Sequence, residues 1–144
     1  MDNNPTYDDG QMSVDYDTTD AVEMSAVVEG EYKLSVIKAE WKHPKPESDK
    51  EWVGIQMMLD IPDEISADFF SHLHFLPHKS QEPKNYQRAL GDLKVFKEAF
   101  GFAPDEPFTP DQLVGREAWA YLTVRDDPQY GRSNQVKKWI TGPQ

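Results

Sequence analysis

The sequence predicts a mainly β protein: a small five-stranded barrel with one helix between its third and fourth strands, preceded by an acidic segment. Residues 51–61 and 117–125 alternate apolar and polar side chains, as half-buried strands do. Only residues 85–100 place apolar side chains at convincing long-helix spacing. The first 30 residues hold eight acidic side chains and neither Lys nor Arg. At 144 residues the chain is long enough for one domain with a core of its own.

The first strand is predicted over residues 31–42, and its apolar side chains change face near Val36. A bulge or sharp bend at that point would let one long strand serve two sides of a closed sheet. The loop of residues 43–50 follows, with two prolines, and Trp41 and Trp52 flank it. We therefore expect a hairpin loop with an aromatic side chain at each end.

The second strand has the clearest alternation in the chain and ends at Pro62. A third strand is predicted over residues 69–76, a run rich in aromatic side chains. Its alternation is compatible with two inward apolar side chains and two histidines on the opposite, solvent-facing side: Leu73 and Phe75 inward, His72 and His74 outward.

Two imidazoles two residues apart on a strand can converge on a metal ion, and His78 follows them. No carboxylate or cysteine lies at a spacing that would complete a tetrahedral metal site with these histidines. We therefore expect the histidines to lie on a binding surface, and we expect the protein to use neither a metal ion nor a cofactor. The sequence also lacks a nucleophile elbow, a phosphate loop, a zinc-protease helix and a paired-carboxylate motif. No enzymatic activity is expected.

The helix of residues 85–100 is predicted to pack its apolar stripe on the barrel along its length. Gly101 and Phe102 after it suit a Schellman ending. Thr109 and Gln112 form a capping box that starts a short helical turn before the fourth strand.

Residues 115–140 predict a hairpin that reverses at a turn with Pro128 and Gly131. Small aliphatic side chains of its first strand face inward, whereas Trp119, Tyr121 and Arg125 face outward. On the return strand the expected inward side chains are Val136 and Ile140, and the expected outward ones are Gln135, Lys137 and Trp139. Rings interleaved with cations suit a single-stranded nucleic acid, which offers bases and phosphates. Cross-strand packing or cover by a helix would use the same residues, so both interpretations stay open.

The element order, with a bent first strand and the helix between strands three and four, is that of an OB-fold barrel. Such a barrel would bind on strands two and three and on the loops that here comprise residues 43–50 and 126–133. The chain resembles small phage-encoded single-stranded DNA-binding proteins with this fold over about residues 29–140. The resemblance is carried by EGEYKLSVIKAEW, AFGF, LVGREAWAYLTV and YGRSNQVKKW.

This resemblance implies a sequence-independent protein that protects single-stranded DNA in phage replication or recombination. It implies a location in the host cytoplasm and, as partners, single-stranded DNA and phage or host replication and recombination proteins. The alternative is an acidic protein-interaction module, such as a DNA mimic or a structural phage component, with the aromatic side chains buried at a protein interface. The candidate nucleic-acid-binding residues are Trp41, Lys42, Lys45, Trp52, Trp119, Tyr121, Arg125, Tyr130, Arg132, Lys137, Lys138 and Trp139.

The acidic segment is predicted to be a flexible arm over residues 1–28, with the OB-fold domain over residues 29–144. The whole chain carries a net charge of −11, but residues 31–144 hold 15 basic and 18 acidic side chains and are nearly balanced. Either the arm is a solubilising leader, or it competes with DNA for the basic surface or docks partner proteins.

The composition and the N-terminus also predict the cellular location. The chain has no cysteine, and its N-terminus lacks the basic start and apolar run of a signal peptide. No window approaches membrane-spanning length. We expect a cytosolic protein without membrane contact, and an oligomer is compatible with the sequence.

Overall fold

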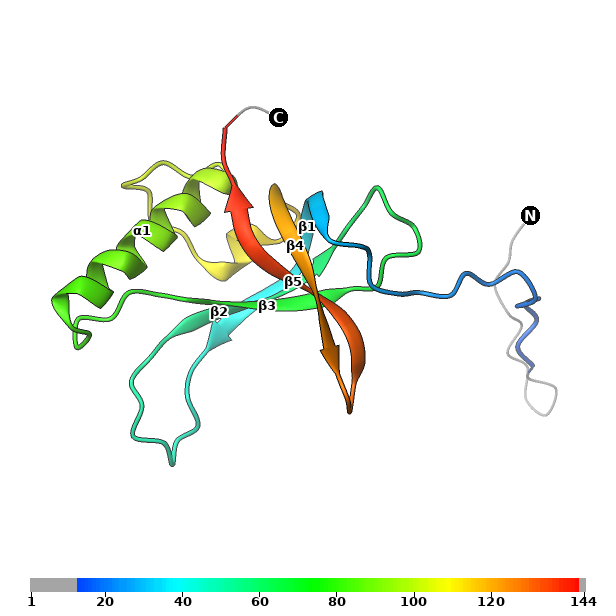
Figure 1. The fold of residues 1–144 in the computed structure, drawn as a ribbon, viewed down its shortest axis with the longest axis horizontal. Coiled ribbons are helices and arrows are strands. Elements are labelled where there is room, and N and C mark those ends of the chain that lie inside the picture. Colours follow the sequence, from blue (N-terminus) through cyan, green and yellow to red (C-terminus); the bar gives the residue numbers. More distant parts are fainter. Residues whose placement is uncertain (1–12, 143–144) are drawn as a thin grey trace.

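The computed structural model describes residues 13–142, so residues 1–12 of the predicted arm lie outside it. Its strands form one antiparallel sheet in the order β3-β2-β1-β4-β5, which curls into a nearly closed barrel (Figure 1). The helix α1 lies between β3 and β4, and the predicted OB-like fold is confirmed. The elements are β1 (Gly30–Lys42), β2 (Gly54–Asp60), β3 (Phe70–Phe75), α1 (Pro83–Ala99), the 3₁₀ helix η1 (Pro110–Leu113), β4 (Glu117–Asp127) and β5 (Gly131–Ile140).

A bulge in β1 allows this one strand to pair on two sides. Its pairing with β2 shifts register between Val36 and Lys38, so Ile37 is the extra residue. Residues 30–35 pair with β4, whereas most of the pairing with β2 lies beyond the bulge. The bulge predicted near Val36 is therefore confirmed, and it bends the sheet toward closure.

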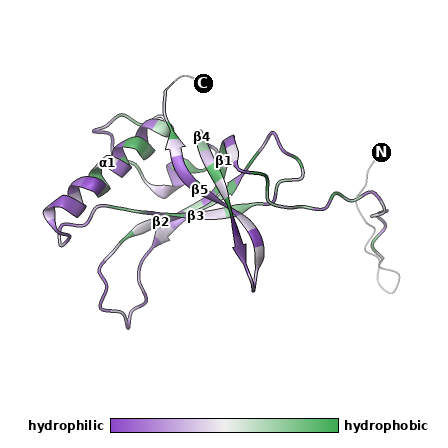
Figure 2. Ribbon diagram, viewed as in Figure 1, coloured by the Kyte–Doolittle hydropathy of each residue, from purple (hydrophilic) through white to green (hydrophobic). Residues whose placement is uncertain are grey.

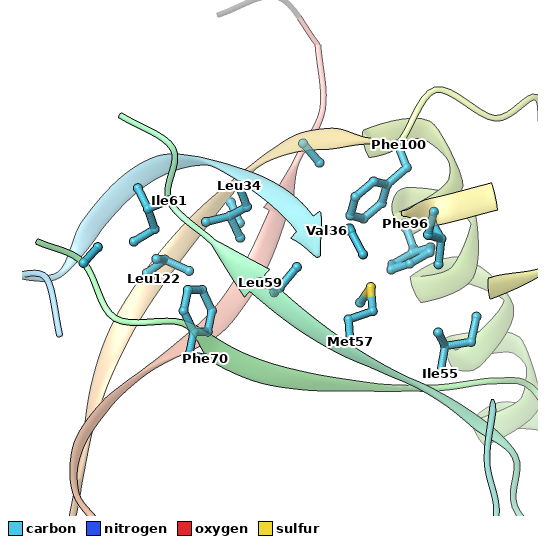
Figure 3. Close-up of a cluster of buried hydrophobic side chains, with 14 of the residues drawn as sticks. Leu34, Val36, Ile55, Met57, Leu59, Ile61, Phe70, Phe96, Phe100 and Leu122 are labelled. Carbon is cyan, nitrogen blue, oxygen red and sulfur yellow. The ribbon is translucent and has the colours of Figure 1, made fainter. Parts of the chain in front are cut away.

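Apolar side chains from β1 to β4 and from α1 fill the barrel interior (Figure 3). The alternation predicted for β2 is confirmed by Ile55, Met57 and Leu59, of which none is more than 1% exposed. The alternation predicted for β4 is confirmed in the same way by its buried small and aliphatic side chains, Ala118, Ala120 and Leu122.

Only the C-terminal half of α1 packs on the barrel. Phe96 is fully buried and Phe100 is 3% exposed, but Leu90 is 37% exposed. The N-terminal half of the helix extends past the end of the barrel and is mostly hydrophilic (Figures 1 and 2). The prediction that the whole apolar stripe packs on the barrel is therefore wrong for the part that begins at Tyr86, since no strand lies beneath it.

Both predicted helix-end signals are confirmed. Gly101 has a φ of 84°, and the N–H of Phe102 donates to the carbonyl of Lys97 at 2.8 Å, as a Schellman ending requires. At η1, the N–H of Thr109 donates to Oε1 of Gln112 at 2.8 Å. These local signals place the chain correctly for its entry into β4.

The structure reverses the predicted orientation of β3. His74 is 8% exposed, whereas Phe75 is 56% exposed. The run has apolar or aromatic side chains on both faces, so alternation alone does not define its inward side. The pairing of buried Phe70 with buried Leu59 fixes that side instead. The inward side chains are Phe70, His72 and His74, and the outward ones are Ser71, Leu73 and Phe75.

A second bulge, at Lys137, reverses the orientation of the end of β5. Tyr121 pairs with Lys138, but Leu122 pairs with Val136, which leaves Lys137 without an opposite residue. A prediction from alternation assumes a regular strand without an extra residue. It therefore assigns the wrong side of the sheet to every position after the bulge.

Trp139 consequently points inward, and its predicted outward position is wrong. Its ring lies 4.9 Å from that of Phe100 and 5.6 Å from that of Phe96. Ile140, predicted inward, pairs with Trp119 on the outer side of the sheet. Trp139 is therefore part of the packing between α1 and the barrel.

The last residues of the predicted arm belong to the folded domain. Ser25 forms a parallel β-bridge with Ala67. The backbone N–H and carbonyl of Val27 both hydrogen-bond the side-chain amide of Asn134, at 2.9 and 3.0 Å. Residues 13–24 form no helix or strand. The predicted boundary at residue 28 thus falls inside the folded part.

Candidate nucleic-acid interface

The outer face of β2 and β3, here called the β2–β3 face, presents a row of exposed apolar side chains. Phe75 is 56% exposed, Phe69 is 53% exposed and Met58 is 38% exposed. The solvated face of an antiparallel sheet normally carries polar side chains. Two exposed phenyl rings and a thioether on one face therefore mark a surface that is suited to a flat apolar ligand.

Gly54 allows the side chain of Leu73 to lie flat on this face. A Cβ atom at position 54 would lie 2.8 Å from Cδ1 of Leu73 and 3.0 Å from the carbonyl oxygen of His74. Beside Gly54, the ring of Trp52 meets the ring of Phe75 edge-on, with centroids 5.2 Å apart. Trp52, a candidate from the sequence, therefore joins the row.

We expect Gly54→Ala to lower the free energy of unfolding by about 1–3 kcal/mol. The added methyl group would meet the backbone carbonyl of His74, which cannot rotate aside as a side chain can. Urea denaturation measures the change. Gly91→Ala is the matched control, since no atom lies within 4 Å of a Cβ there and a helical alanine is favourable. Equal stability of Gly54→Ala and the wild-type protein would contradict the close approach.

Cationic side chains of β1 border one side of the row. Beyond the bulge of that strand, Lys38 pairs with Met58 and Lys42 pairs with Gly54. Glu40 lies between the two lysines along the strand, so the border is mixed in charge. Trp41, a candidate from the sequence, lies near the end of β1 and is 49% exposed. The candidate Lys45 lies in the loop that follows, between β1 and β2.

A groove of about 330 Å³ continues the row toward the β4–β5 hairpin. Arg125 lines this groove together with Phe69, Ser71 and Gln135. A ring, a cation and polar side chains in one groove can stack a base, pair with a phosphate and accept or donate hydrogen bonds. The structure thus places Arg125 beside the β2–β3 face.

The tip of the hairpin carries two further candidates. Tyr130 is 80% exposed, and Arg132 forms an ion pair with Asp126 at 3.2 Å. Asp127 accepts backbone hydrogen bonds from Gln129 and Tyr130, which hold its pKa below the ordinary value of 3.8. These contacts fix the turn, and the two acids offset part of the positive charge at the tip.

Trp119 and Tyr121 face outward from β4, as predicted, but they neighbour β1 and β5 and not the β2–β3 face. Trp119 pairs with Lys33, and Tyr121 pairs with Glu31. The hydroxyl of Tyr121 donates to a carboxylate oxygen of Glu29 at 2.9 Å, and this hydrogen bond is the main reason why the pKa of Tyr121 lies above 10.0. Basic side chains lie here too: Lys33 is opposite Trp119, and Nζ of Lys137 lies 5.6 Å from the centre of the Tyr121 ring. The charge around this second aromatic pair is therefore mixed.

The sequence did not identify Phe69, Phe75, Met58 and Lys38 as members of the candidate interface. The available signal was the aromatic-rich run of residues 69–76, in which one face had to be exposed. No protein-family model matches the chain, and no curated protein sequence matches it.

The two histidines of β3 are neutral at pH 7, with His74 buried and His72 partly buried. Burial lowers the pKa of His74 to about 4, and burial together with the proximity of His74 lowers that of His72 to about 4. Within residues 13–142, no cluster of three or more His, Cys, Asp or Glu side chains is arranged to hold a metal ion. The same residues contain no helix of the length and apolar character required to cross a membrane.

Proposed function

We propose that this protein binds single-stranded DNA without sequence preference, through the β2–β3 face. The observation that carries the proposal is the row of exposed rings, Phe69 and Phe75, on the face where OB-fold barrels bind oligonucleotides. Lys38, Lys42 and Arg125 lie beside this row. The proposed role is protection of exposed single strands during phage replication or recombination, as in the phage-encoded class that the sequence resembles.

Stacking explains both the affinity and the lack of sequence preference. Each base that stacks on an aromatic side chain contributes about 1–3 kcal/mol, and every base has a face that can stack. A duplex hides these faces inside its own stack, so it cannot use the rings of Phe69 and Phe75. The flanking cations contact phosphates, which adds a term that salt weakens.

The net charge does not oppose this function. Residues 31–144 hold 15 basic and 18 acidic side chains, so the repulsion that a strand meets there is small. The other eight acidic side chains lie in residues 1–30, and their repulsion is screened over about 8 Å at physiological ionic strength. Two stacked bases outweigh a repulsion of that kind.

The test is fluorescence anisotropy with labelled oligo-dT, with unlabelled duplex of equal length as competitor. We expect the duplex to compete poorly, and log K to fall against log salt by about 0.7 for each phosphate neutralised. Phe69→Ala and Phe75→Ala should each weaken binding by about 5- to 150-fold, which corresponds to one lost stacking contact. Tyr16→Ala removes a ring that is 48% exposed on the N-terminal segment and is the matched control.

Three results would contradict the proposal: duplex that competes as well as oligo-dT, phenylalanine variants that bind like the wild type, or a control variant that weakens binding equally. Binding to no oligonucleotide at all would favour the protein-interaction module, in which the same rings contact another protein.

A further inference from the structure

A groove follows the seam where the barrel does not close. β3 and β5 are the two ends of the sheet and form no ladder with each other. Between them and α1 lies a groove of about 530 Å³, here called the seam groove, within the range of about 300–1,000 Å³ that is typical of ligand sites. Its lining includes His72, Phe75, Val95, Lys137, Lys138 and Trp139.

One part of the seam groove is aromatic and rigid. The ring of His72 meets the ring of Trp139 edge-on at 5.5 Å, and Trp139 rests on Phe96 at 5.6 Å. Because Phe96 is fully buried, this cluster is held in place by the core. Rigid rings that line an open groove can receive a flat apolar group such as a nucleobase.

The rim on β5 carries two adjacent lysines because of the bulge at Lys137. Consecutive residues of a regular strand point to opposite faces, so one lysine would otherwise face the core. With the bulge, Lys137 and Lys138 both stay exposed and Trp139 turns inward. Bulges commonly redirect side chains beside binding sites. Asp92 of α1 also lines the groove, so these three side chains together carry one net positive charge.

The seam groove is continuous with the β2–β3 face. Phe75 belongs to the exposed row of that face and also lines the groove. A strand that stacks a base on Phe75 therefore reaches the groove with its next nucleotides. The same strand can therefore occupy both surfaces, with its bases on the aromatic side of the groove and its phosphates on the cationic side.

We infer that the seam groove is a second nucleotide-binding site, which holds the continuation of a single strand bound on the β2–β3 face. Bases lie against Phe75 and Trp139, and backbone phosphates lie at Lys137 and Lys138. This inference rests on the proposed function, and it adds that the bound length exceeds what the β2–β3 face alone accommodates.

The test is a length series of oligo-dT titrated against two groove variants. Lys137→Gln/Lys138→Gln removes the rim charges, and Val95→Trp fills the groove from α1, where Val95 is 39% exposed. Their matched controls are Lys79→Gln/Lys84→Gln, with the same loss of charge, and Val114→Trp at a side chain that is 48% exposed and lies outside the groove.

Wild-type affinity should rise as the oligonucleotide grows beyond the length that fills the β2–β3 face. Both groove variants should lose this increment, about tenfold for one stacked base, and should bind the shortest oligonucleotides like the wild type. The controls should keep the increment. Thermal unfolding of each variant verifies that it is folded.

Two outcomes overturn the inference alone: groove variants that keep the full length dependence, or groove variants that weaken short and long oligonucleotides equally while Phe69→Ala still weakens both. If the wild-type protein binds no oligonucleotide of any length, the proposed function fails and the second site fails with it.

Discussion

Lowering the pH from 7 to 5 is expected to reduce the free energy of unfolding by about 3 kcal/mol, because two buried histidines resist protonation. The pKa values of His72 and His74 fall from 6.5 to about 4 in the folded protein. Between these values the unfolded chain binds more protons than the folded one. Their contribution to stability is therefore complete above pH 6.5 and declines as the pH falls toward 4.

The environment of the two rings explains the size of this effect. The Nε2 atoms of His72 and His74 are buried, and neither has a hydrogen-bond partner in the described part of the chain. The ring of His74 lies 4.4 Å from that of Phe96, and each histidine is close to the other. A proton added to either ring would place a charge in a largely buried position against the rings of Trp139 and Phe96. The charged side chains near this pair are Asp92 of α1 and Lys137 and Lys138 of β5, which line the same groove.

Urea denaturation at pH 7, 6 and 5 measures the effect. His72→Phe/His74→Phe should show much less dependence on pH over this range, since neither replacement can be protonated. His43→Asn, at an exposed loop position, should follow the wild type. If the double variant loses as much stability as the wild-type protein, the histidines are not its source.

Trp139→Ala is expected to lower the free energy of unfolding by about 3 kcal/mol, close to the value for removal of a large core side chain. Trp139 is partly buried and packs against His72, Phe96 and Phe100, so its loss leaves a cavity between α1 and the barrel. Trp119→Ala is the matched control, because Trp119 faces outward from β4.

The two tryptophan variants are compared by urea denaturation at pH 7. We expect Trp119→Ala to lose less than half as much stability as Trp139→Ala. Equal losses would contradict the inward packing of Trp139. A gain in exposed apolar surface in Trp139→Ala, seen as binding of a hydrophobic dye, would support the cavity.

The features that the sequence predicted correctly are the ones that local patterns encode. The alternation of β2 and β4, the bulge after Val36, the Schellman ending at Gly101 and the capping box at Thr109 all depend on residues close together in the chain. The element order then follows, and with it the OB-like fold. The positions of Trp52 just before β2 and of Arg125 near the end of β4 follow from the element order alone.

The errors arose where pairing between distant strands decides the outcome. β3 is apolar on both faces, and only its pairing with β2 shows that Phe75 faces out. The extra residue at Lys137 is visible only opposite Tyr121 and Leu122, so Trp139 was placed on the wrong side. Both errors misplaced part of the aromatic surface. The sequence placed Trp139 on the outside and Phe75 on the inside, whereas the structure turns Trp139 inward and exposes Phe75.

The two hydrogen bonds between the backbone of Val27 and the side chain of Asn134 determine where this domain can be shortened. Asn134 is 3% exposed, and its side-chain amide makes two hydrogen bonds to the backbone of Val27. A third hydrogen bond, at 3.3 Å, goes to the carbonyl of Thr123. A fragment beginning at Glu29 would leave most of a buried amide without partners, which costs about 1–3 kcal/mol. A fragment that keeps these contacts and the bridge of Ser25 to Ala67 must begin no later than Ser25. Residues 25–28 of the predicted arm are therefore as much a part of the folding unit as the strands.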